Sequence, residues 1–397
     1  MSYVILFSML TKDQLKQIAV TNFPKSISRP KYVEQIMSWM VRKEIIIIKG
    51  IRRCGKTHIM YQLMQKLPKN NSFYFNFDDF RFDNYLSVDL LESIIELRNP
   101  KKRSYFFFDE IQRISGFEKW LRTYYDKETN IKFIIGGSNI SLLTPKLGTV
   151  LTGRNISFNI FPLSYSEFKS FSKKDFDVYL EFGGFPEVVL ESDELKKRGL
   201  VERYLSDIMN RDILEKYNVD NPKQLKALIK FFISNPGVKI TANKLASQLG
   251  IHKDTVQKYI SCAVDAFLIF EVPYFSYSAK TKYIASRASK YYVVDNGMHT
   301  ATSIRRNLGT LYENLIAVNL ISKGFELMYW SNGVEIDFVY QNNAVQVTAT
   351  DKIPLRETKA FFEFNKTNAL FNNVIISPTK KQEGKINYVP IEEFLLK

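Results

Sequence analysis

The stretch GIRRCGKT, residues 50–57, decides the fold of the first part of this chain. It follows a run of four isoleucines, residues 45–48, and precedes an amphipathic stretch, residues 58–67. Strand, glycine-containing loop and helix in this order are typical of the GxxxxGK loop followed by Ser or Thr, whose backbone N–H groups and helix N-terminus face the phosphates of a nucleotide. The pattern therefore predicts a nucleotide triphosphate site. The alternative is a glycine-rich turn after a buried strand.

We expect this loop to bind ATP together with Mg²⁺. Lys56 would reach the β- and γ-phosphates, and the Thr57 hydroxyl would bind the metal ion. Cys54 stands at a variable position of the loop and is expected to be inert, although its oxidation could affect binding. The predicted nucleotide-binding residues are Gly50, Arg52, Arg53, Cys54, Gly55, Lys56, Thr57 and His58.

A second buried strand ends in two acidic residues. Residues 105–108 form an unbroken apolar run, which is typical of a parallel strand buried on both faces. The run is followed by Asp109 and Glu110, at the strand end where open α/β sheets bind ligands. We expect Asp109 to order the magnesium shell and Glu110 to act as the catalytic base on water. The alternative is an ordinary acidic loop after a strand.

Two further polar residues follow predicted strands. Asn139 comes soon after a strand at residues 132–136, and it could hold the lytic water or instead cap a helix. Arg154 precedes a strand at residues 156–160. It could neutralise charge on the transferred phosphoryl group, in cis or from a neighbouring subunit, or be a surface arginine. The predicted catalytic residues are Lys56, Glu110, Asn139 and Arg154.

The length and composition limit the class of protein. A chain of 397 residues is too long for one hydrophobic core, so two or three domains are expected. Its 45% hydrophobic and 24% charged residues are ordinary for a folded, soluble protein. The two cysteines, Cys54 and Cys262, fit no zinc pattern and favour a reducing compartment. The first apolar run is too short for a signal peptide or a membrane span, so we expect a cytoplasmic protein without a membrane partner.

Positive charge is concentrated in one part of the chain. The formal net charge is +15, and residues 222–290 contain eleven Lys or Arg against three acidic residues. Such an excess favours polyanionic partners such as nucleic acid. Lysine-rich surfaces also serve solubility, so the charge alone does not decide between the two.

Several motifs together resemble one family. They are GIRRCGKT, FDDFRF, FFFDEIQ, GGSN, LTGR followed by FPLSYSEF, GGFPEVV and, more weakly, GTLYENLIAVNL and EIDFVY. This set is similar to archaeal and bacterial AAA+-type ATPases in which a P-loop domain precedes a domain of unknown function. The resemblance implies an ASCE-class sheet, a winged-helix segment and a restriction-endonuclease-like terminal domain. The resemblance does not indicate which cellular process uses the ATPase activity.

The middle of the chain reads as a helix-turn-helix. Helices are predicted at residues 224–233, 240–249 and 253–266, with Thr241 as an N-cap and Gly250 ending the second helix. In a helix-turn-helix the last of these helices would read the DNA major groove. Strands at residues 267–272 and 291–294 could form a wing.

The third predicted helix separates into two faces. Val256, Tyr259, Ile260 and Ala263 lie at core spacing, which leaves the polar side chains outward. The alternative to DNA binding is a packing or protein-interaction module. The predicted contacts to double-stranded DNA are Lys253, Gln257 and Lys258.

The last part of the chain has the element order of PD-(D/E)xK nucleases. A helix is predicted at residues 310–322, strands at 325–330, 335–340, 344–348 and 374–376, a turn at 331–333 and a helix at 355–364. By this resemblance, Glu313 and Asp337 occupy the first two places of the nuclease site. The third place is Gln346-Val347-Thr348, where an amide binds Mg²⁺ weakly and no lysine is present. Nuclease activity is therefore not expected.

These inferences combine into one architecture. The predicted fold class is an α/β parallel-sheet P-loop NTPase, followed by a winged helix and an α+β restriction-endonuclease-like domain. The predicted domains are the ATPase domain at 1–165, a helical lid or linker at 166–218, the winged helix at 219–285 and the endonuclease-like domain at 286–397.

The predicted function is a magnesium-dependent ATPase coupled to DNA or partner binding, either alone or as a homo-oligomer. The alternatives are a nucleotide-dependent switch or transcriptional regulator with little turnover, and a scaffold with a vestigial loop.

Overall fold

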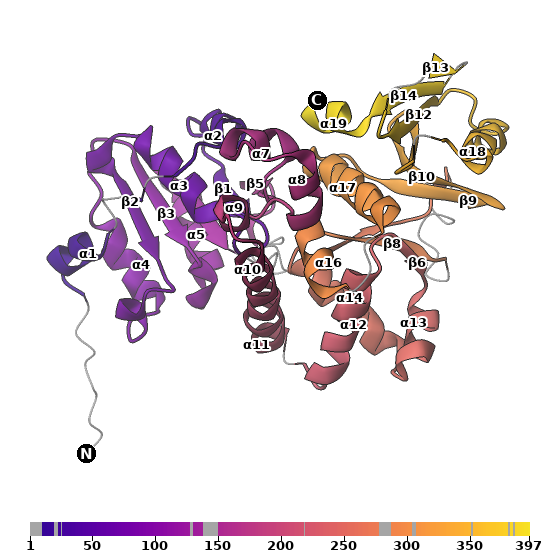
Figure 1. Ribbon diagram of the computed structural model, residues 1–397. Helices are drawn as coiled ribbons and strands as arrows, with labels where there is room; N and C mark the ends of the chain where they lie inside the picture. The colour runs from indigo at the N-terminus through magenta and orange to yellow at the C-terminus, as the bar shows by residue number, and fades with distance from the viewer. Residues whose placement is uncertain are drawn as a thin grey trace. The chain divides into compact units, whose positions relative to one another are not determined.

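The computed structural model describes residues 10–19, 23–24, 26–127, 130–137, 150–217, 219–277, 287–303, 307–350, 352–379, 382–383 and 386–397. Contacts between residues divide the chain into two compact units. The first comprises Met1–Gly50 and Gly55–Ile160, and the second comprises Ile51–Cys54 and Phe161–Lys397. Each unit is built around its own sheets (Figure 1).

The first unit contains a five-stranded sheet in which all neighbouring strands are parallel. Its strand order is β2-β3-β4-β1-β5, which confirms the predicted parallel α/β sheet. The strand that precedes the glycine loop and the strand that ends in the acidic pair are separated by β4. The strands are β1 (Ile45–Lys49), β2 (Ser72–Asn76), β3 (Ser104–Asp109), β4 (Ile131–Gly137) and β5 (Asn155–Asn159).

Helices cover this sheet because its strands are apolar on both faces. Alternate side chains of the strands, among them Phe75, Phe106 and Phe108, form one core with residues of α1, α4 and α5. Short 3-10 turns follow several strand ends. The helices are α1 (Lys12–Ile18), α2 (Pro30–Met37), α3 (Lys56–Gln65), α4 (Val88–Ile95) and α5 (Phe117–Lys127), and the turns are Lys69–Asn71, Phe80–Phe82 and Ile111–Arg113.

The second unit opens with a series of helices. The longest of them, α10, continues directly into a π-helical segment, Ile208–Leu214. No helix in the described ranges is both long enough and apolar enough to cross a bilayer. The helices are α7 (Tyr165–Phe171), α8 (Phe176–Phe182), α9 (Pro186–Leu190), α10 (Glu194–Asp207) and α11 (Glu215–Tyr217).

Three helices and a three-stranded antiparallel sheet follow. The predicted helix at 240–249 begins two residues later, because Thr241 caps it by accepting a hydrogen bond from the Lys244 N–H. Gly250 ends the same helix in the left-handed conformation, φ 65°, as predicted. The sheet has the order β6-β8-β7. The elements are α12 (Pro222–Ser234), β6 (Val238–Ile240), α13 (Ala242–Leu249), α14 (Lys253–Asp265), β7 (Ile269–Val272) and β8 (Ser289–Val293).

A six-stranded mixed sheet ends the chain, with the order β13-β14-β12-β11-β10-β9. The predicted turn at 331–333 is wrong except at Gly333. Ser331 and Asn332 belong to β9, and Gly333, at φ 70°, lets the chain reverse directly between Asn332 and Val334. The elements are α16 (Asn296–Thr302), α17 (Leu308–Ser322), β9 (Met328–Asn332), β10 (Val334–Tyr340), β11 (Asn343–Val347), α18 (Leu355–Asn365), β12 (Asn372–Ser377), β13 (Gln382–Glu383), β14 (Ile386–Pro390) and α19 (Ile391–Leu396).

Candidate nucleotide site

The glycine loop lies between the carboxyl end of β1 and the first turn of α3. Gly55 precedes α3 with φ 99°, a conformation that glycine adopts at little cost. Lys56 is 6% exposed, and its Nζ donates to the Gly50 carbonyl at 2.9 Å. The lysine is thus folded back over the loop, at a helix N-terminus whose dipole favours an anion.

Thr57 and Asp109 meet although they are 52 residues apart in sequence. The Thr57 hydroxyl donates to Asp109 Oδ2 at 2.7 Å, and the Tyr74 hydroxyl donates to the same oxygen at 2.9 Å. The other carboxylate oxygen, Asp109 Oδ1, is buried without a hydrogen-bond partner among the described residues. A hydroxyl and a buried carboxylate oxygen with unused lone pairs suit Mg²⁺, which prefers one or two carboxylates together with phosphate and water oxygens.

Gly136, in the strand between β1 and β3, leaves room for the Asp109 carboxylate. A Cβ atom at this position would lie 2.8 Å from Asp109 Oδ1 and 2.3 Å from Met60 Cε. Neither contact is possible for a real side chain. Neither Gly136 nor Tyr74 was predicted to belong to this site. A glycine at the end of a buried apolar strand was the available signal for the first.

Glu110 follows Asp109 in the left-handed conformation, with φ 54°. Its N–H donates to the Gly136 carbonyl at 2.9 Å, and its carboxylate accepts from the Gln112 amide. Burial raises the pKa of Glu110 to about 7, helped by the Asp109 charge and opposed by Lys56. A carboxyl that titrates near neutrality is suited to act as a general base.

Arg154 does not lie at this site. It immediately precedes β5, and its carbonyl accepts from the Ile45 N–H at 2.8 Å, at the amino end of β1. The loop follows the opposite, carboxyl end. The guanidinium instead pairs with Asp126 at 3.0 Å. The in-cis role predicted for Arg154 is therefore wrong, because parallel strands begin at one edge of a sheet and end at the other.

The other residues predicted for the nucleotide site differ in their environments. Asn139 lies outside the described residues. Burial lowers the pKa of His58 in the first turn of α3. Cys54 is fully buried and belongs by its contacts to the second unit, as do Arg52 and Arg53.

The two loop arginines contact other residues of that unit. Arg52 donates to both carboxylate oxygens of Asp212, each at 2.9 Å. The Arg53 guanidinium lies 5.5 Å from the centre of the Tyr204 ring. With both side chains engaged in this way, the loop would offer a nucleotide backbone N–H groups rather than arginine side chains.

The predicted DNA-contact residues lie along α14. Gln257 and Lys258 are exposed and Lys253 is half-buried. Lys258 Nζ is 3.8 Å from a carboxylate oxygen of Asp220, in a largely solvated pair. The four residues predicted to face the core of this helix are all buried: Val256, Tyr259, Ile260 and Ala263.

The structure brings Glu313 of α17 and Asp337 of β10 together around the ammonium of Lys290. The Gln346 side chain bonds instead to the backbone of β10, accepting from the Asp337 N–H at 3.0 Å and donating to the Glu335 carbonyl at 2.6 Å. Lys290 and Glu335 were not predicted to belong to this site. A lysine directly before the strand predicted at 291–294 was the signal for the first.

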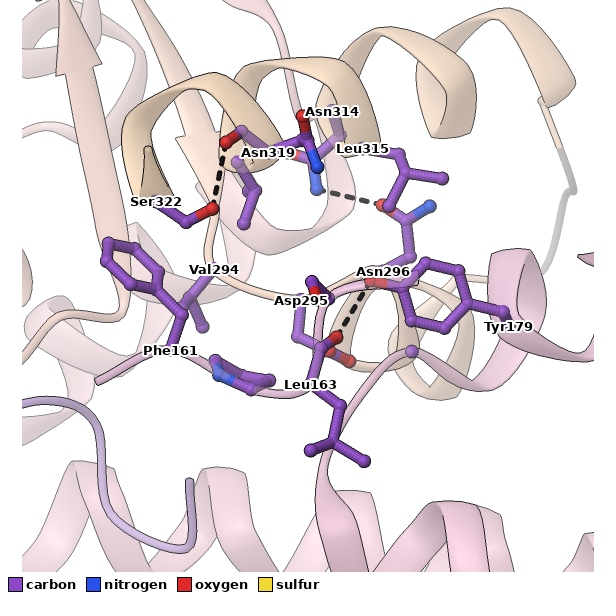
Figure 2. Close-up of a pocket in the computed structure, with 14 residues that line it drawn as sticks. Phe161, Leu163, Tyr179, Val294, Asp295, Asn296, Asn314, Leu315, Asn319 and Ser322 are labelled. Atoms are coloured by element: carbon purple, nitrogen blue, oxygen red, sulfur yellow. Dashed lines mark hydrogen bonds between the residues drawn. The ribbon is translucent and has the colours of Figure 1, made fainter. Parts of the chain in front are cut away.

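A small polar cavity lies elsewhere in the second unit (Figure 2). Its volume of about 30 Å³ has room for about two water molecules. Asp295 lies on it, fixed by the N–H groups of Gly184 and Gly297 at 2.7 and 2.9 Å. A Cβ atom on Gly183 would collide with the Asp295 carboxylate, and one on Gly184 would collide with the Leu163 backbone, which explains the paired glycines of the GGFPEVV motif. Other polar residues at the cavity are Ser164, Asn296, Asn314, Asn319 and Ser322.

Among the described residues, side chains alone form no metal-binding cluster. In the part of the chain that is described, no group of three or more His, Cys, Asp or Glu residues is placed to hold a metal ion. A magnesium ion at Thr57 and Asp109 would therefore depend on phosphate and water for its other ligands.

Two families match this chain. An AAA domain matches residues 42–169, and a domain of unknown function, DUF8612, matches residues 173–308. The AAA match spans all five strands of the parallel sheet. Together with the loop between β1 and α3, it identifies the first unit as an AAA+-type P-loop domain, the class predicted from the motifs.

The similar proteins narrow this class to a family. The chain is 32% identical over 364 residues to the uncharacterized protein MJ1544 of Methanocaldococcus jannaschii, covering 84% of this chain and 79% of that one. It is 28% identical over 337 residues to an uncharacterized protein of Haemophilus influenzae, covering 79% and 83%. The chain belongs to the same family as MJ1544.

Solved structures resemble the chain more distantly. A point mutant of Thermotoga maritima RuvB has a TM-score of 0.35 at 17% identity, covering 63% of this chain and 93% of that one. Aeropyrum pernix ORC1, in complex with DNA, has a TM-score of 0.33 at 12% identity, covering 70% and 93%. Scores below 0.5 do not establish a shared overall fold.

Proposed function

We propose that this protein hydrolyses ATP with Mg²⁺ and uses the reaction to control its binding to DNA or to a protein partner. The observation that carries the first part is the hydrogen bond between Thr57 and Asp109 at 2.7 Å, beside Asp109 Oδ1, which has no hydrogen-bond partner in the described part of the chain. These oxygens lie next to a helix N-terminus and Lys56, so a triphosphate would find positive charge there and its metal ion would find oxygen ligands.

Each residue of the site has a distinct role in this proposal. The backbone N–H groups of the loop and Lys56 bind the phosphates. Thr57 and Asp109 hold Mg²⁺, which neutralises negative charge on the phosphates. Glu110 accepts a proton from the attacking water, since burial raises the pKa of its carboxyl to about 7. Arg154 could act only from a neighbouring subunit, and Asn139 remains a predicted water-positioning residue.

The test is the Glu110→Gln variant, which keeps the size of the side chain and removes the base. It should bind ATP with unchanged affinity and release phosphate about 100-fold more slowly or worse. Glu118→Gln, on α5, is the matched control and should hydrolyse ATP at the wild-type rate. A wild-type protein that binds ATP and shows no measurable turnover would instead favour the nucleotide-dependent switch or transcriptional regulator.

We further propose that residues 219–285 form a winged helix that binds duplex DNA. The helices α12 to α14 and the strands β6 and β7 support this proposal, although β8, the strand that pairs with both β6 and β7, lies beyond residue 285. So do the exposed Gln257 and Lys258 on the second helix of the helix-turn-helix, and the charge excess of the segment. Residues 1–165, 166–218 and 286–397 would be the ATPase domain, the lid or linker, and the nuclease-like domain.

Salt titration of DNA binding tests this second proposal. The affinity for a labelled random-sequence duplex should fall linearly with salt on a logarithmic plot. Replacing Lys253 and Lys258 by Ala should lower the slope by about 2, since each removes about one phosphate contact. Lys119→Ala, an exposed lysine of the first unit, should leave the slope unchanged. Binding that is absent or independent of salt would favour a protein-interaction module.

A further inference from the structure

The Lys290 side chain is one of the most deeply buried charged groups of the second unit, at 3% exposure. Its Nζ lies 2.9 Å from Glu313 Oε1, 2.7 Å from Glu335 Oε1 and 3.2 Å from Asp337 Oδ1. An ammonium group has three N–H donors. Two of them are donated to Glu313 and Asp337, and the ammonium also pairs with the Glu335 carboxylate, so a substrate phosphate would have to displace a carboxylate to reach Lys290.

The carboxylate oxygens are almost as fully engaged as the ammonium. Glu313 Oε1 also accepts from the Tyr292 hydroxyl at 2.6 Å, and Asp337 Oδ2 accepts from the Val347 N–H at 2.9 Å. Glu335 Oε2 accepts from Lys239 at 2.6 Å. The cluster is thus closed by groups of the protein itself.

The strand register explains how two lysines come to share this cluster. Lys239 of β6 and Lys290 of β8 are direct partners in the antiparallel sheet. Like charges opposite one another are destabilising, but here both side chains reach the Glu335 carboxylate. Burial alone would lower the pKa of Lys290, yet the three carboxylates raise it well above its ordinary value. Lys290 therefore stays charged.

The nuclease resemblance implies Mg²⁺ between Glu313 and Asp337, and the residues present do not fit that ion. The oxygens stand 2.7 to 3.2 Å from Nζ, which are hydrogen-bond distances, whereas Mg²⁺ needs oxygens at about 2.0–2.1 Å. Gln346, in the third place of the motif, turns to the backbone. The centre of the cluster is occupied by the ammonium.

We propose that the Lys290 ammonium takes the place of a divalent cation in this cluster, so that the domain is held together without a metal and does not cleave DNA. The ammonium joins β8 to β10 and α17, and thereby ties the three-stranded sheet to the six-stranded sheet through charge. Removing it uncovers a divalent-cation site made of Glu313, Glu335 and Asp337.

The charges of the cluster support the replacement of a divalent cation by the Lys290 ammonium. Three carboxylates and the two lysines leave one net negative charge when all are ionised. Without Lys290 the net charge becomes −2, which a divalent cation balances. The oxygens would then need to move inward by about 1 Å to reach metal-ligand distances.

Manganese binding to the nucleotide-free full chain, followed by electron paramagnetic resonance, tests the proposal. The wild type and Asp337→Asn should bind the same number of Mn²⁺ ions, because the cluster binds none. Lys290→Met should bind one ion more, at least about tenfold more tightly than any wild-type ion. Lys290→Met/Asp337→Asn should lose that ion. Mn²⁺ should also raise the melting temperature of Lys290→Met and not that of the double variant.

Several outcomes would overturn the proposal. One is a wild-type Mn²⁺ site that Asp337→Asn removes, and another is plasmid nicking by wild type that requires Mn²⁺ and Asp337. A folded Lys290→Met protein without an additional ion would also overturn it. If Lys290→Met does not fold, the comparison of the wild type with Asp337→Asn decides alone, since it needs no change at Lys290.

Discussion

At the scale of single residues, Glu110 combines an unusual backbone with an unusual carboxyl group. A left-handed conformation costs a non-glycine residue about 1–2 kcal/mol, and Glu110 adopts it at φ 54°. The turn directs the chain out of β3 directly after Asp109. Backbone strain of this kind concentrates at functional sites. The energetic cost of this conformation favours a catalytic role for Glu110 over a packing role.

The pKa of Glu110 leads to a prediction for the rate of ATP hydrolysis. A base acts in its deprotonated form, and burial raises the pKa of Glu110 to about 7. The value of kcat/KM should therefore rise with pH and level off above about 8, with an approximately tenfold gain between pH 6 and pH 8. Phosphate release at low ATP concentration measures it. The residual activity of Glu110→Gln should not show this rise, and a similar rise in that variant would assign the titration to another group.

The residues of the candidate site differ in how far a sequence can reveal them. Lys56, Thr57, Asp109 and Glu110 follow from local motifs, because the loop and the strand end are each contiguous in sequence. Lys290 could not be identified as a member of the acidic cluster. Its partners come from a helix and another strand. Their proximity depends on how these elements pack, which cannot be predicted from a single sequence.

At the scale of elements, β4 acts as the spacer between the loop strand and the acidic strand. It pairs with β1 on one side and β3 on the other. Gly136 lies opposite Asp109 in that pairing. Because glycine has no side chain, the carboxylate can reach across β4 to the Thr57 hydroxyl. The contact between loop and acid therefore depends on a strand that contributes no functional side chain at this position.

Substituting Gly136 by Ala should disturb this arrangement. The new methyl group would meet Asp109 Oδ1 and Met60, so we expect a loss of about 1–3 kcal/mol in unfolding free energy, together with slower ATP hydrolysis. Urea denaturation and phosphate release measure the two effects. Gly199→Ala, in α10, meets nothing within 4 Å and should stabilise by about 0.5–1 kcal/mol. Full activity in Gly136→Ala would show that Asp109 need not occupy its observed position.

Boundaries that depend on local signals were easier to predict than boundaries that depend on strand pairing. The cap at Thr241 and the stop at Gly250 are local signals, and they delimit α13 as expected, apart from its first two residues. The strand predicted at 325–330 is shifted to Met328–Asn332. Its position depends on pairing with β10 across Gly333 and not on its own composition. The order of the strands could not be predicted from the residues. The family resemblance implied only the class of the first sheet.

At the scale of the whole molecule, a buried carboxyl group links stability to pH. Burial raises the pKa of Asp295 to about 7, although two backbone N–H groups act in the opposite direction. An unfolded aspartate has a pKa near 3.9. The folded protein therefore holds the additional proton between these values, and the stability from this group is complete at low pH and lost as pH rises towards 7.

Urea denaturation at pH 5, 6 and 7 tests this linkage. The unfolding free energy of the wild type should contain a decrease of about 1 kcal/mol per pH unit that Asp295→Asn lacks. The variant should be less stable at pH 5, because Asn offers one acceptor oxygen to the two N–H groups of Gly184 and Gly297. Parallel pH profiles for the two proteins would contradict the assignment.

The strand order β2-β3-β4-β1-β5 has a consequence for synthesis on the ribosome. The isoleucine-rich β1 is made first, yet its partners β4 and β5 end at residues 137 and 159. At 5–20 residues per second, both edges of β1 remain unpaired for roughly 5 to 20 seconds. Apolar β-branched segments aggregate readily in that state. Arg42, Lys43 and Glu44, directly before the strand, are charged residues of the kind that oppose aggregation of an apolar strand during this interval.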